Sequence, residues 1–468
     1  MSTPTFLIYD IETSGLDPCF GQVFQFAAIR TTLDLEEIER YEYRIKINPD
    51  TIPHPQAMLT TGLSMEDVQQ GESEYDVISR IHALMNTPNT CSMGYNTLGF
   101  DDEFLRFSFF RNGLTPYTHQ YANGCSRADI FPITLLYSRF KRDVLSWPER
   151  DDRPSLKLED INAMNSLAKG SAHDAMVDVE ATLALAKRLY AEKATWDYAM
   201  GYFNKGTDAK RLNTLPALHE HKQHAYRYGL LLSPSFGYQQ NYLAPVLYLG
   251  QHMHYKNQSL WLRLDKEPFT ESLFEGVIDF SFVVRKKMAE PPLLLPPDDR
   301  YLAHLTSTAQ EQTQANLEWL NTHIDCLNEA RTATAQESYP DIPHCDAQAS
   351  LYQAGFPTPE DNRMNQRFKE ANCDGKVALL DEISNPLYYT LFVRVLGRLG
   401  LNLGEHQAVF DEYLSSVWSD SDSPVLDYKG KPRFNVKQCL QAIVELNPDQ
   451  QSLLADINSY ISEHTKHF

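Results

Sequence analysis

Hydrophobic and polar residues alternate in different ways along three stretches of the chain. In residues 1–195, short runs rich in β-branched and aromatic residues are interleaved with segments of helical period, which is typical of an α/β domain. Because short links join the first three apolar runs, we expect these to open a sheet as an antiparallel meander. The predicted strands are Thr5–Thr13, Gln25–Thr32, Arg40–Ile47 and Cys91–Tyr95, and the predicted helices are Glu74–Met85, Asp101–Arg111, Asp160–Leu167 and Ala175–Ala191.

The second stretch, residues 196–350, is rich in β-forming residues. Tyr, Leu, Val and Trp are frequent in Asn241–Asp265, and Leu260–Asp265 alternates with a period of two, as expected of a strand. Gly276–Val284 has the same character, whereas Ala303–Ala330 has helical composition. This pattern predicts a small barrel followed by a helical segment.

The third stretch, residues 351–468, is predicted to be all-α. It contains four segments of helical character that are separated by Gly or Pro, which commonly mark helix ends. We therefore expect three domains, at residues 1–195, 196–350 and 351–468. The four helical segments are 359–371, 386–400, 406–418 and 448–464.

Charge and composition limit the classes of function. The chain of 468 residues has 42 basic and 62 acidic residues, a net charge of −20, which argues against a protein that coats DNA non-specifically. Its seven cysteines are odd in number and none are spaced as C-x-x-C, so a zinc ribbon or disulfide framework is not expected. No apolar run approaches the roughly 20 residues of a membrane span, and no signal-peptide pattern is present. We therefore expect a cytoplasmic protein without a membrane partner.

Two carboxylates lie at the end of the first predicted strand. Asp10 and Glu12 are two residues apart, so strand alternation places both on one face. Two neighbouring acids repel each other unless a cation lies between them, and their hard oxygen atoms suit Mg²⁺ or Mn²⁺. Two solvated acids that enter a turn are the alternative interpretation of this pair alone.

Two further segments have residues with similar chemistry. Gly94–Asn96 ends a short strand, and Asp101 and Asp102 follow it at the start of a helix, where either acid could simply cap the helix. His173 and Asp178 are five residues apart at the front of a later helix, where both could be ordinary surface residues.

Taken in chain order, these residues resemble the DEDD exonuclease superfamily, histidine subclass. The resemblance is closest to the bacterial exonuclease I family, and it implies a ribonuclease H-like domain with a mixed sheet flanked by helices, an SH3-like barrel domain and a helical C-terminal domain. It also implies an exodeoxyribonuclease that degrades single-stranded DNA from the 3′ end to 5′-mononucleotides, in DNA repair and recombination. The segments that resemble the family are FLIYDIETSGLDP, QFAAIR, GYNTLGFDDE, SWPERDD, NSLAKGSAHDAMVDVEATLALAK and AQASLYQAGF.

The resemblance implies a hydrolysis that uses two metal ions. Two Mg²⁺ ions, with Mn²⁺ as the alternative, would activate the attacking water and neutralise the leaving 3′-oxygen. The residues implied as metal ligands are Asp10, Glu12, Asp101 and Asp178. Asp101 is chosen over Asp102 because the family motif has the ligand at the first of the two neighbouring aspartates. His173 would be the general base.

Substrate contacts are expected from residues around this constellation. Thr13 follows the Asp-x-Glu pair, and its backbone N–H could face the terminal 3′-hydroxyl. Lys157 lies where the family is expected to have an Arg near the scissile phosphate; a Lys keeps the charge but loses the bidentate geometry. Aromatic residues in the loop after the second helix could stack on bases. The complete expected set is Glu12, Thr13, Arg106, Tyr117, Tyr121 and Lys157.

Basic residues form local clusters in spite of the acidic composition. His219, His221 and His224 lie among several of them, which predicts a loop that follows the DNA phosphates, with a metal site as the alternative. The resemblance also implies a monomer that docks the acidic C-terminal tail of single-stranded-DNA-binding protein. Arg139, Lys141 and Arg142 are the candidates for that contact.

Two other functions are considered. A DEDD exonuclease that acts on RNA or proofreads for a polymerase usually resembles only the first domain, whereas this chain has about 270 further residues. A catalytically inactive single-strand-binding module would be favoured by a missing acid or histidine, but all five positions are filled.

Overall fold

The computed structural model describes residues 3–170, 173–221, 224–271, 280–419 and 425–466. The chain forms two compact units, each of which contains segments that are distant in sequence. The first unit is Met1–Arg127 with Ala168–Leu183 and Asp341–Phe468, and the second is Ala128–Leu167 with Ala184–Pro340. Among the described residues, no helix combines the length and the apolar character that crossing a bilayer requires.

The first unit contains a five-stranded mixed sheet in the order β3-β2-β1-β4-β5. β1, β2 and β3 form the antiparallel meander that the sequence predicts, whereas β4 and β5 run parallel to β1. Odd-numbered residues of β1, among them Leu7, Tyr9 and Ile11, are buried in a core with Phe26 and Phe104. The strands are β1 Thr5–Thr13, β2 Val23–Thr31, β3 Glu37–Arg44, β4 Thr90–Met93 and β5 Ser126–Arg127.

Helices flank this sheet, as the sequence predicts. α3 Glu74–Met85 and α4 Asp101–Arg111 have the expected bounds, and α7 Ala175–Tyr190 ends one residue before the expected end. α3 begins at the side-chain cap of Ser73, whereas α4 begins with acidic residues in its first turn, where they interact favourably with the helix dipole. Two shorter helices precede these, α1 Pro55–Thr61 and α2 Met65–Gln69.

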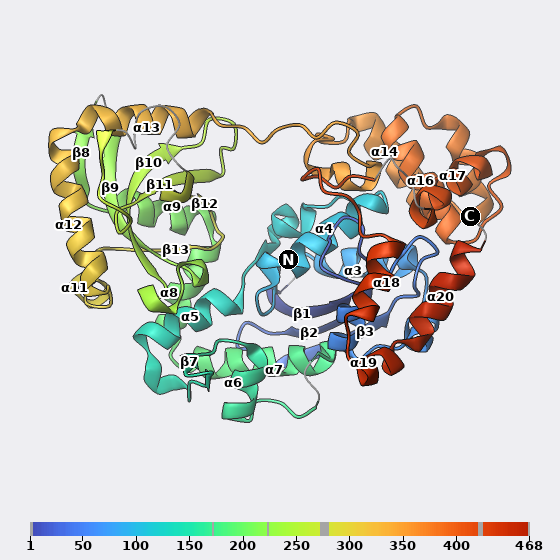
Figure 1. Cartoon of the computed structure of the whole chain (residues 1–468), viewed down its shortest axis with the longest axis horizontal. Coiled ribbons are helices and arrows are strands. Elements are labelled where there is room, and N and C mark those ends of the chain that lie inside the picture. Colours follow the sequence, from blue (N-terminus) through green and yellow to red (C-terminus); the bar gives the residue numbers. More distant parts are fainter. Residues whose placement is uncertain (1–2, 171–172, 222–223, 272–279, 420–424, 467–468) are drawn as a thin grey trace. The chain divides into compact units, whose positions relative to one another are not determined.

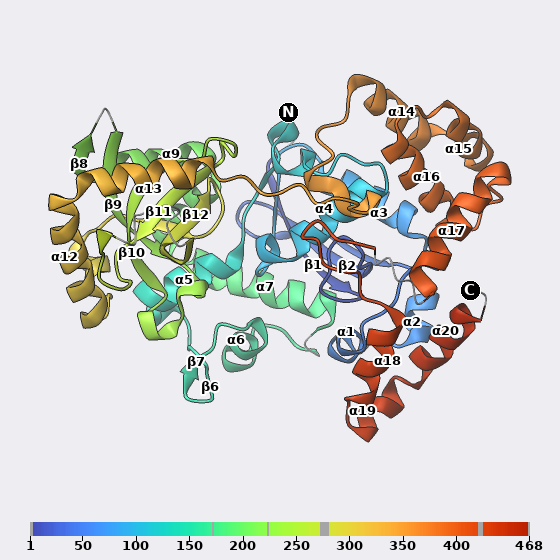
Figure 2. The ribbon, with the colours of Figure 1, turned by 45° about the horizontal axis from the view of Figure 1, so that its top comes forward.

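The C-terminal part of the first unit is all-α, which confirms the prediction. Its helices share one core with the N-terminal part, where Phe20 and Phe107 belong to the same cluster as Phe392 and Tyr413. These helices are coloured orange to red in Figure 1. In Figure 2, α18 lies beside α1, and α20 beside α2. The helices are α14 Pro359–Glu370, α15 Cys373–Leu379, α16 Pro386–Arg398, α17 Gln407–Trp418, α18 Val436–Val444, α19 Pro448–Leu453 and α20 Ala455–Thr465.

The second unit is built on an antiparallel sheet in the order β12-β11-β10-β9-β13, with β8 also paired to β9. α12 Ser307–Thr322 and α13 Ile324–Gln336 cover it, since Leu320 and Leu327 share a core with Leu247. The strands are β8 Ala217–His221, β9 His224–Leu232, β10 Leu243–Gln251, β11 Gln258–Arg263, β12 Val283–Lys287 and β13 Leu293–Leu295; its other α-helices are α5 Ile130–Phe140, α6 Leu158–Asn165, α8 Lys193–Met200, α9 Lys205–Thr214 and α11 Asp299–Leu302.

Some expectations for the second unit are only partly covered by the structure. The β-rich second region is confirmed, but the first four residues of the strand expected at Gly276–Val284 fall outside the described residues. Of the other five, Phe280–Phe282 form a 3-10 helix and only the last two belong to a strand, β12. Residues 222–223, which link β8 to β9 through the expected histidine cluster, are also outside them. The closure of this sheet as an SH3-like barrel therefore stays a prediction.

The compact units differ from the domain boundaries expected at residues 195 and 350. The helical C-terminal segment belongs to the same unit as the first sheet, because the two share a hydrophobic core. Residues 128–167 belong to the unit of the second sheet, although they lie within the first predicted domain. Hydrophobic patterning shows where a segment has an apolar face, but not which distant segment covers that face. The three-domain division stays a prediction.

Candidate active site

The end of β1 extends beyond its neighbour β4. Pairing between the two strands stops at Ile8 and Met93, so Asp10–Thr13 have no strand on that side. Gly94 follows β4 at the point where the chain passes β1. A Cβ atom at Gly94 would lie 2.3 Å from the carbonyl oxygen of Tyr9, so only glycine allows this approach. The close passage brings the following segment, including Asp101, to the end of β1.

Asp101 faces this end of β1. Its Oδ1 accepts a hydrogen bond of 3.2 Å from the backbone N–H of Ile11, the residue between Asp10 and Glu12. The side chain of Ile11 points into the core on the opposite face of the strand. The three carboxylates of Asp10, Glu12 and Asp101 therefore gather on one face, as the alternation of β1 predicts.

Asp102 is directed to a different environment although it is the next residue. Its Oδ1 lies 3.0 Å from Nε2 of His119 and its Oδ2 lies 2.5 Å from Nη1 of Arg127. Burial raises the pKa of Asp102, but Arg127 and the hydrogen bond from His119 outweigh burial and hold this pKa well below its ordinary value. Asp102 is thus neutralised inside the protein, whereas Asp101 faces the end of β1.

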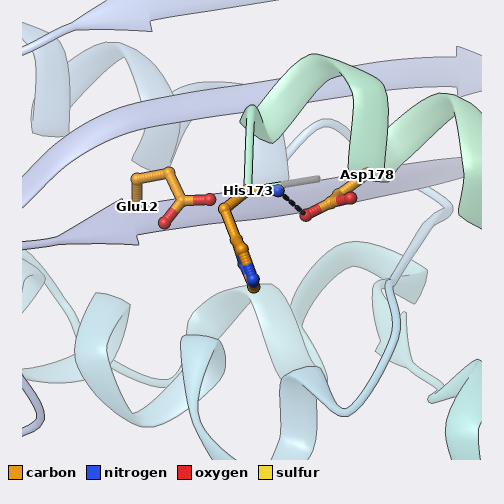
Figure 3. Close-up of side chains that lie close together, drawn as sticks. All are labelled: Glu12, His173 and Asp178. Atoms are coloured by element: carbon orange, nitrogen blue, oxygen red, sulfur yellow. Dashed lines mark hydrogen bonds between the residues drawn. The ribbon is translucent and has the colours of Figure 1, made fainter. Parts of the chain in front are cut away.

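His173 and Asp178 reach the same place from the N-terminal end of α7 (Figure 3). Potential ligand atoms of Glu12, His173 and Asp178 all lie within 4.8 Å of one another. The backbone N–H of His173 donates a 3.1 Å hydrogen bond to Oδ2 of Asp178, and His173 has a left-handed backbone with φ of 65°. Residues that are more than 160 positions apart in sequence are thus brought to within ligand distance of one another.

The carboxylates of this cluster act on one another electrostatically. Burial raises the pKa of Glu12 to about 8, and the charges of Asp178 and Asp101 act in the same direction. Burial also raises the pKa of Asp10 well above its ordinary value, and Asp101, Glu12 and Asp178 add to this effect. Such a collection of buried like charges is unfavourable without a cation. Oxygen donors and one imidazole at these distances fit a divalent metal.

A cavity of about 590 Å³ opens beside Glu12 and Thr13. This volume is in the usual range for a small-molecule site. The lining is mostly apolar and includes two residues of the C-terminal segment. Its lining includes Leu16, Phe20, Ile52, His54, Phe100, Arg433 and Phe434.

The remaining predicted residues have separate positions. Thr13 lines the cavity, and its hydroxyl donates to the carbonyl of Gly15 at 2.8 Å. Nε of Arg106 lies 3.4 Å from Asp102 and its guanidinium lies 5.9 Å from the ring centroid of Tyr117, so these contacts do not support a role in phosphate binding. That role stays a prediction.

The last two expected substrate contacts are exposed. Tyr121 is 66% exposed, which leaves it accessible to a base. Lys157 belongs to the second unit, where its Nζ lies 3.6 Å from Glu159. Both roles stay predictions.

Sequence reasoning did not find His54 or Phe434 as members of the cavity wall. The ring centroids of His54 and Phe434 are 4.7 Å apart, although the two residues are separated by 380 positions. His54 lies in a proline-rich segment that gave no chemical pattern. Phe434 follows the basic residues Lys429, Lys431 and Arg433 in a stretch without a catalytic or metal-binding motif, so only the tertiary structure could bring the pair together.

Comparison with known proteins finds similarity over the part of the chain that contains this constellation. The family model described as "Exonuclease" matches residues 7–186, which include all five predicted catalytic and metal-binding positions. Residues 7–186 are thus similar to exonuclease domains. Exonucleases of this superfamily depend on metal ions, which agrees with the oxygen-rich cluster. This match agrees with the nuclease that the order of the motifs predicts.

Relatives of known name support the more specific resemblance. Exodeoxyribonuclease I of Escherichia coli is 38% identical over 205 residues, which are 43% of this chain and 43% of that protein. The alignment thus spans less than half of either chain. The resemblance to exonuclease I is confirmed for this part.

Solved structures extend the likeness to the complete fold. The structure of E. coli exonuclease I in complex with a dA16 oligonucleotide has a TM-score of 0.82 and 24% identity, over 99% of this chain and 100% of that chain. A zinc-bound complex of the same E. coli enzyme with single-stranded DNA also has a TM-score of 0.82, at 23% identity and the same coverage. The predicted fold, a mixed sheet with helices, a further sheet and a helical C-terminal region, is confirmed.

Proposed function

We propose that this protein is an exodeoxyribonuclease that degrades single-stranded DNA from the 3′ end and releases 5′-mononucleotides. The observation that supports this most strongly is the gathering of Asp10, Glu12, Asp101, Asp178 and His173 at the end of β1, beside a cavity that could hold a nucleoside. An acidic cluster next to a cavity suits the cleavage of a terminal phosphodiester bond. The names of the related proteins agree with this substrate.

The four carboxylates would bind the metal ions, for which we propose two Mg²⁺, with Mn²⁺ as the alternative. Bound there, such ions lower the pKa of a water molecule and stabilise charge on the phosphate. The protein itself would supply the proton acceptor, because the imidazole of His173 is within ligand distance of Glu12 and Asp178. The hydrogen bond from the N–H of His173 to Asp178 would hold both residues in place.

The polarity of digestion follows from which end of the strand fits beside Glu12. A terminal nucleoside in the cavity would direct its 3′-hydroxyl to Glu12 and Thr13 and its phosphate to the carboxylate cluster. The cavity wall is apolar and includes Phe100 and Phe434, so it would accept an unpaired base more readily than a base pair. This favours a free single-stranded 3′ end over duplex DNA.

Further contacts are proposed on weaker support. Lys157 and Arg106 would contact phosphates, and Tyr117 and Tyr121 would stack on bases nearer the 5′ end. Docking of the acidic tail of single-stranded-DNA-binding protein would use the basic group Arg139, Lys141 and Arg142 of the second unit. In that group, burial and the charge of Arg142 lower the pKa of Arg139. A bound anion would reduce the repulsion between these two cations. We predict that the protein is a monomer, that it is cytoplasmic and that it acts in DNA repair.

The test is digestion of a 5′-labelled single-stranded oligonucleotide with Mg²⁺ or with EDTA. Wild type should shorten it from the 3′ end only with metal, and His173→Ala should lose most activity, by about 10²–10⁴-fold for a general base. His254→Ala, a change of an exposed histidine on the second unit, is the matched control.

Duplex DNA and an RNA of the same sequence should resist digestion. Comparable cleavage of RNA would move the protein to the ribonuclease branch. Metal-independent activity would contradict the carboxylate assignment. Binding of DNA without cleavage would identify an inactive single-strand-binding module.

A further inference from the structure

The loop of residues 48–54 is held by the C-terminal helical segment. This loop contains Pro49 and Pro53, which have no backbone N–H to share in a regular ladder. Five of its backbone carbonyls accept hydrogen bonds from C-terminal side chains instead. Asn48 and Thr51 accept from the hydroxyl of Tyr460 at 3.3 and 3.2 Å, Pro49 from Nε1 of Trp418 at 2.8 Å, Asp50 from Arg433, and Pro53 from Sγ of Cys439 at 3.5 Å.

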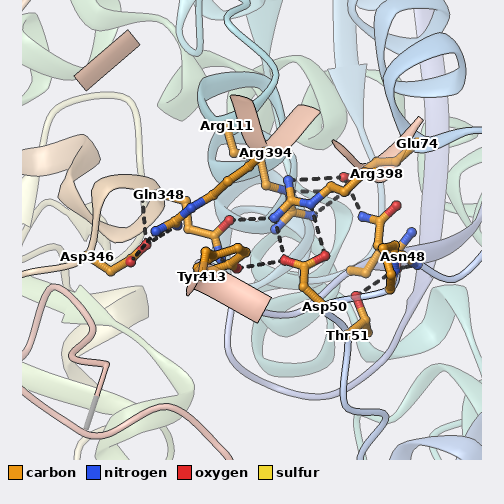
Figure 4. A network of polar contacts seen from close by, with 12 residues as sticks. Asn48, Asp50, Thr51, Glu74, Arg111, Asp346, Gln348, Arg394, Arg398 and Tyr413 are labelled. Carbon is orange, nitrogen blue, oxygen red and sulfur yellow. Dashed lines mark hydrogen bonds and ion pairs between the residues drawn. The ribbon is translucent and has the colours of Figure 1, made fainter. Parts of the chain in front are cut away.

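The side chain of Asp50 adds a second set of contacts in the same place (Figure 4). Its carboxylate accepts from Nε and Nη2 of Arg398 at 2.9 and 2.6 Å and from the hydroxyl of Tyr413 at 2.7 Å. The same hydroxyl accepts a 3.0 Å hydrogen bond from Nη1 of Arg433. The loop and the C-terminal segment are therefore joined by a buried polar network, which costs much free energy to break.

Both ends of this network lead to the cavity beside Glu12. The loop continues into His54, whose backbone N–H donates to the carbonyl of Ser14 at 2.7 Å. Arg433, which is only 7% exposed, is followed directly by Phe434. The rings of His54 and Phe434 meet at 4.7 Å with a tilt of 32°, and both residues line the cavity. One aromatic wall of the cavity is thus positioned from the C-terminal segment.

We propose that Phe434, backed by His54, is a specificity-determining residue that stacks on the base of the 3′-terminal nucleotide. This inference rests on the proposed function and deepens it, because it makes the C-terminal segment a part of the nucleotide site. The catalytic carboxylates contact the phosphate and sugar end, which every nucleotide shares. Phe434 lies on a wall of the same cavity, so it can contact the part of the nucleotide that a duplex would keep paired. Arg433 and Asp50 act as positioning residues for Phe434.

The experiment compares Phe434→Ala with wild type on two oligonucleotides that differ only at the 3′ end. One ends in a normal nucleotide and the other in a stable abasic nucleotide, which has sugar and phosphate but no base. Phe434→Ala should lower kcat/KM for the normal end by about 5- to 150-fold, the range expected for one lost base-stacking contact. The abasic end should be cleaved almost equally by both proteins, because it has no base to stack.

Two variants control for packing. Phe356→Ala removes the same side chain at an 87% exposed position of the C-terminal segment and should leave both substrates unchanged. Phe434→Trp keeps an aromatic surface and should retain activity on the normal end. An equal loss on both substrates, or no loss on the normal end, would overturn the proposal.

Binding without metal separates this proposal from the proposed function. In EDTA, wild type should bind deoxyadenosine 5′-monophosphate more tightly than deoxyribose 5-phosphate, and Phe434→Ala should abolish the difference. If no nuclease activity is found but this difference holds, the proposed function fails and the base-stacking site stands. If activity is found but the two ligands bind wild type equally, only the base-stacking proposal is contradicted.

Discussion

Two groups of buried acids in the first unit have opposite electrostatic environments. At the end of β1, burial and neighbouring carboxylates raise the pKa of Glu12 to about 8. In the loop of residues 48–54, burial raises the pKa of Asp50, but Arg398 and Arg433 outweigh burial and hold this pKa well below its ordinary value. Both carboxyl groups are removed from water, so burial alone does not explain the difference. The neighbouring charges decide it.

This difference in pKa distinguishes the candidate active site at Glu12 from the structural contact at Asp50. Asp50 has its counter-charges within the chain, and its removal leaves buried guanidinium groups unpaired. At the end of β1, the charges of Asp101 and Asp178 raise the pKa of both Asp10 and Glu12, so a bound cation would relieve this repulsion. Strongly raised pKa values within a cleft are a mark of functional sites. Asp102 of α4 resembles Asp50, because Arg127 and His119 hold its pKa well below its ordinary value.

The largest expected effect is on catalysis. Asp10→Asn removes one charge from the carboxylate cluster and should lower kcat for single-stranded DNA by about 10³-fold or more, equivalent to about 4 kcal/mol. The free energy of unfolding without metal should stay equal or rise at pH 9, because like-charge repulsion is relieved. Digestion rates and urea unfolding in EDTA measure the two quantities. A large loss of stability would show that Asp10 is a structural residue.

The next effect is on stability. Asp50→Asn removes the buried charge that pairs with Arg398 and that Arg433 also stabilises, which should lower the free energy of unfolding by about 3–5 kcal/mol. Thermal and urea unfolding in EDTA measure this change. Asp10→Asn is the matched control, since the same substitution there should not destabilise. Similar stability changes in both variants would remove the contrast between the two groups.

The third effect is a dependence of stability on pH. The folded pKa of Glu12 is about 8 against an ordinary value of 4.5, so between these pH values the folded state binds more protons than the unfolded state. The titration of Glu12 should therefore lower the free energy of unfolding of the metal-free protein as pH rises from about 4.5 to about 8, and this one group contributes at most about 1.4 kcal/mol per pH unit. Urea unfolding at several pH values measures the slope.

Glu12→Gln is the control for this slope, because a glutamine does not titrate. Saturating Mg²⁺ should also flatten the slope, since it binds the deprotonated carboxylates. Asp50 contributes in the opposite direction: its lowered pKa stabilises the protein above pH 3.8, and this is lost as pH falls through the folded pKa. A wild-type slope that Glu12→Gln leaves unchanged would assign the titration to another group.

The smallest effect concerns the hydroxyl that links Asp50 to Arg433. Tyr413→Phe keeps the ring but removes hydrogen bonds to both residues, so the free energy of unfolding should fall by about 1–2 kcal/mol. If the network positions Phe434, KM for single-stranded DNA should rise more than kcat falls. Steady-state kinetics on normal and abasic 3′ ends check this, and an unchanged KM would limit the network to a structural role.

Local patterns were sufficient to predict the elements of the first sheet. The period of β1 placed Asp10 and Glu12 on one face, and the bounds of α3 and α4 were predicted correctly. The choice between Asp101 and Asp102 needed either a family resemblance or the fold, because both acids fit a helix N-terminus. Their partners, Ile11 and Arg127, come from different strands, and no local pattern encodes that.

The packing of segments that are distant in sequence could not be predicted from the sequence. The hydrophobic face of α16 shows that something covers it, but not that Phe107 of α4 does. The cavity wall formed by His54 and Phe434 depends on the same packing, since Arg433 reaches the loop only when the C-terminal helices are docked. The sequence therefore predicted the residues of the reaction better than those that would hold the terminal base.

The most direct test of the account is the pair Asp101→Asn and Asp102→Asn. Single-turnover digestion of a 5′-labelled single-stranded oligonucleotide with Mg²⁺ would be measured at a temperature where circular dichroism shows both variants folded. The account predicts that Asp101→Asn loses about 10³-fold in rate at near wild-type stability, whereas Asp102→Asn is destabilised but still cleaves from the 3′ end. Equal losses in both variants, or a greater loss in Asp102→Asn, would contradict the assignment of the carboxylate cluster as the catalytic metal site.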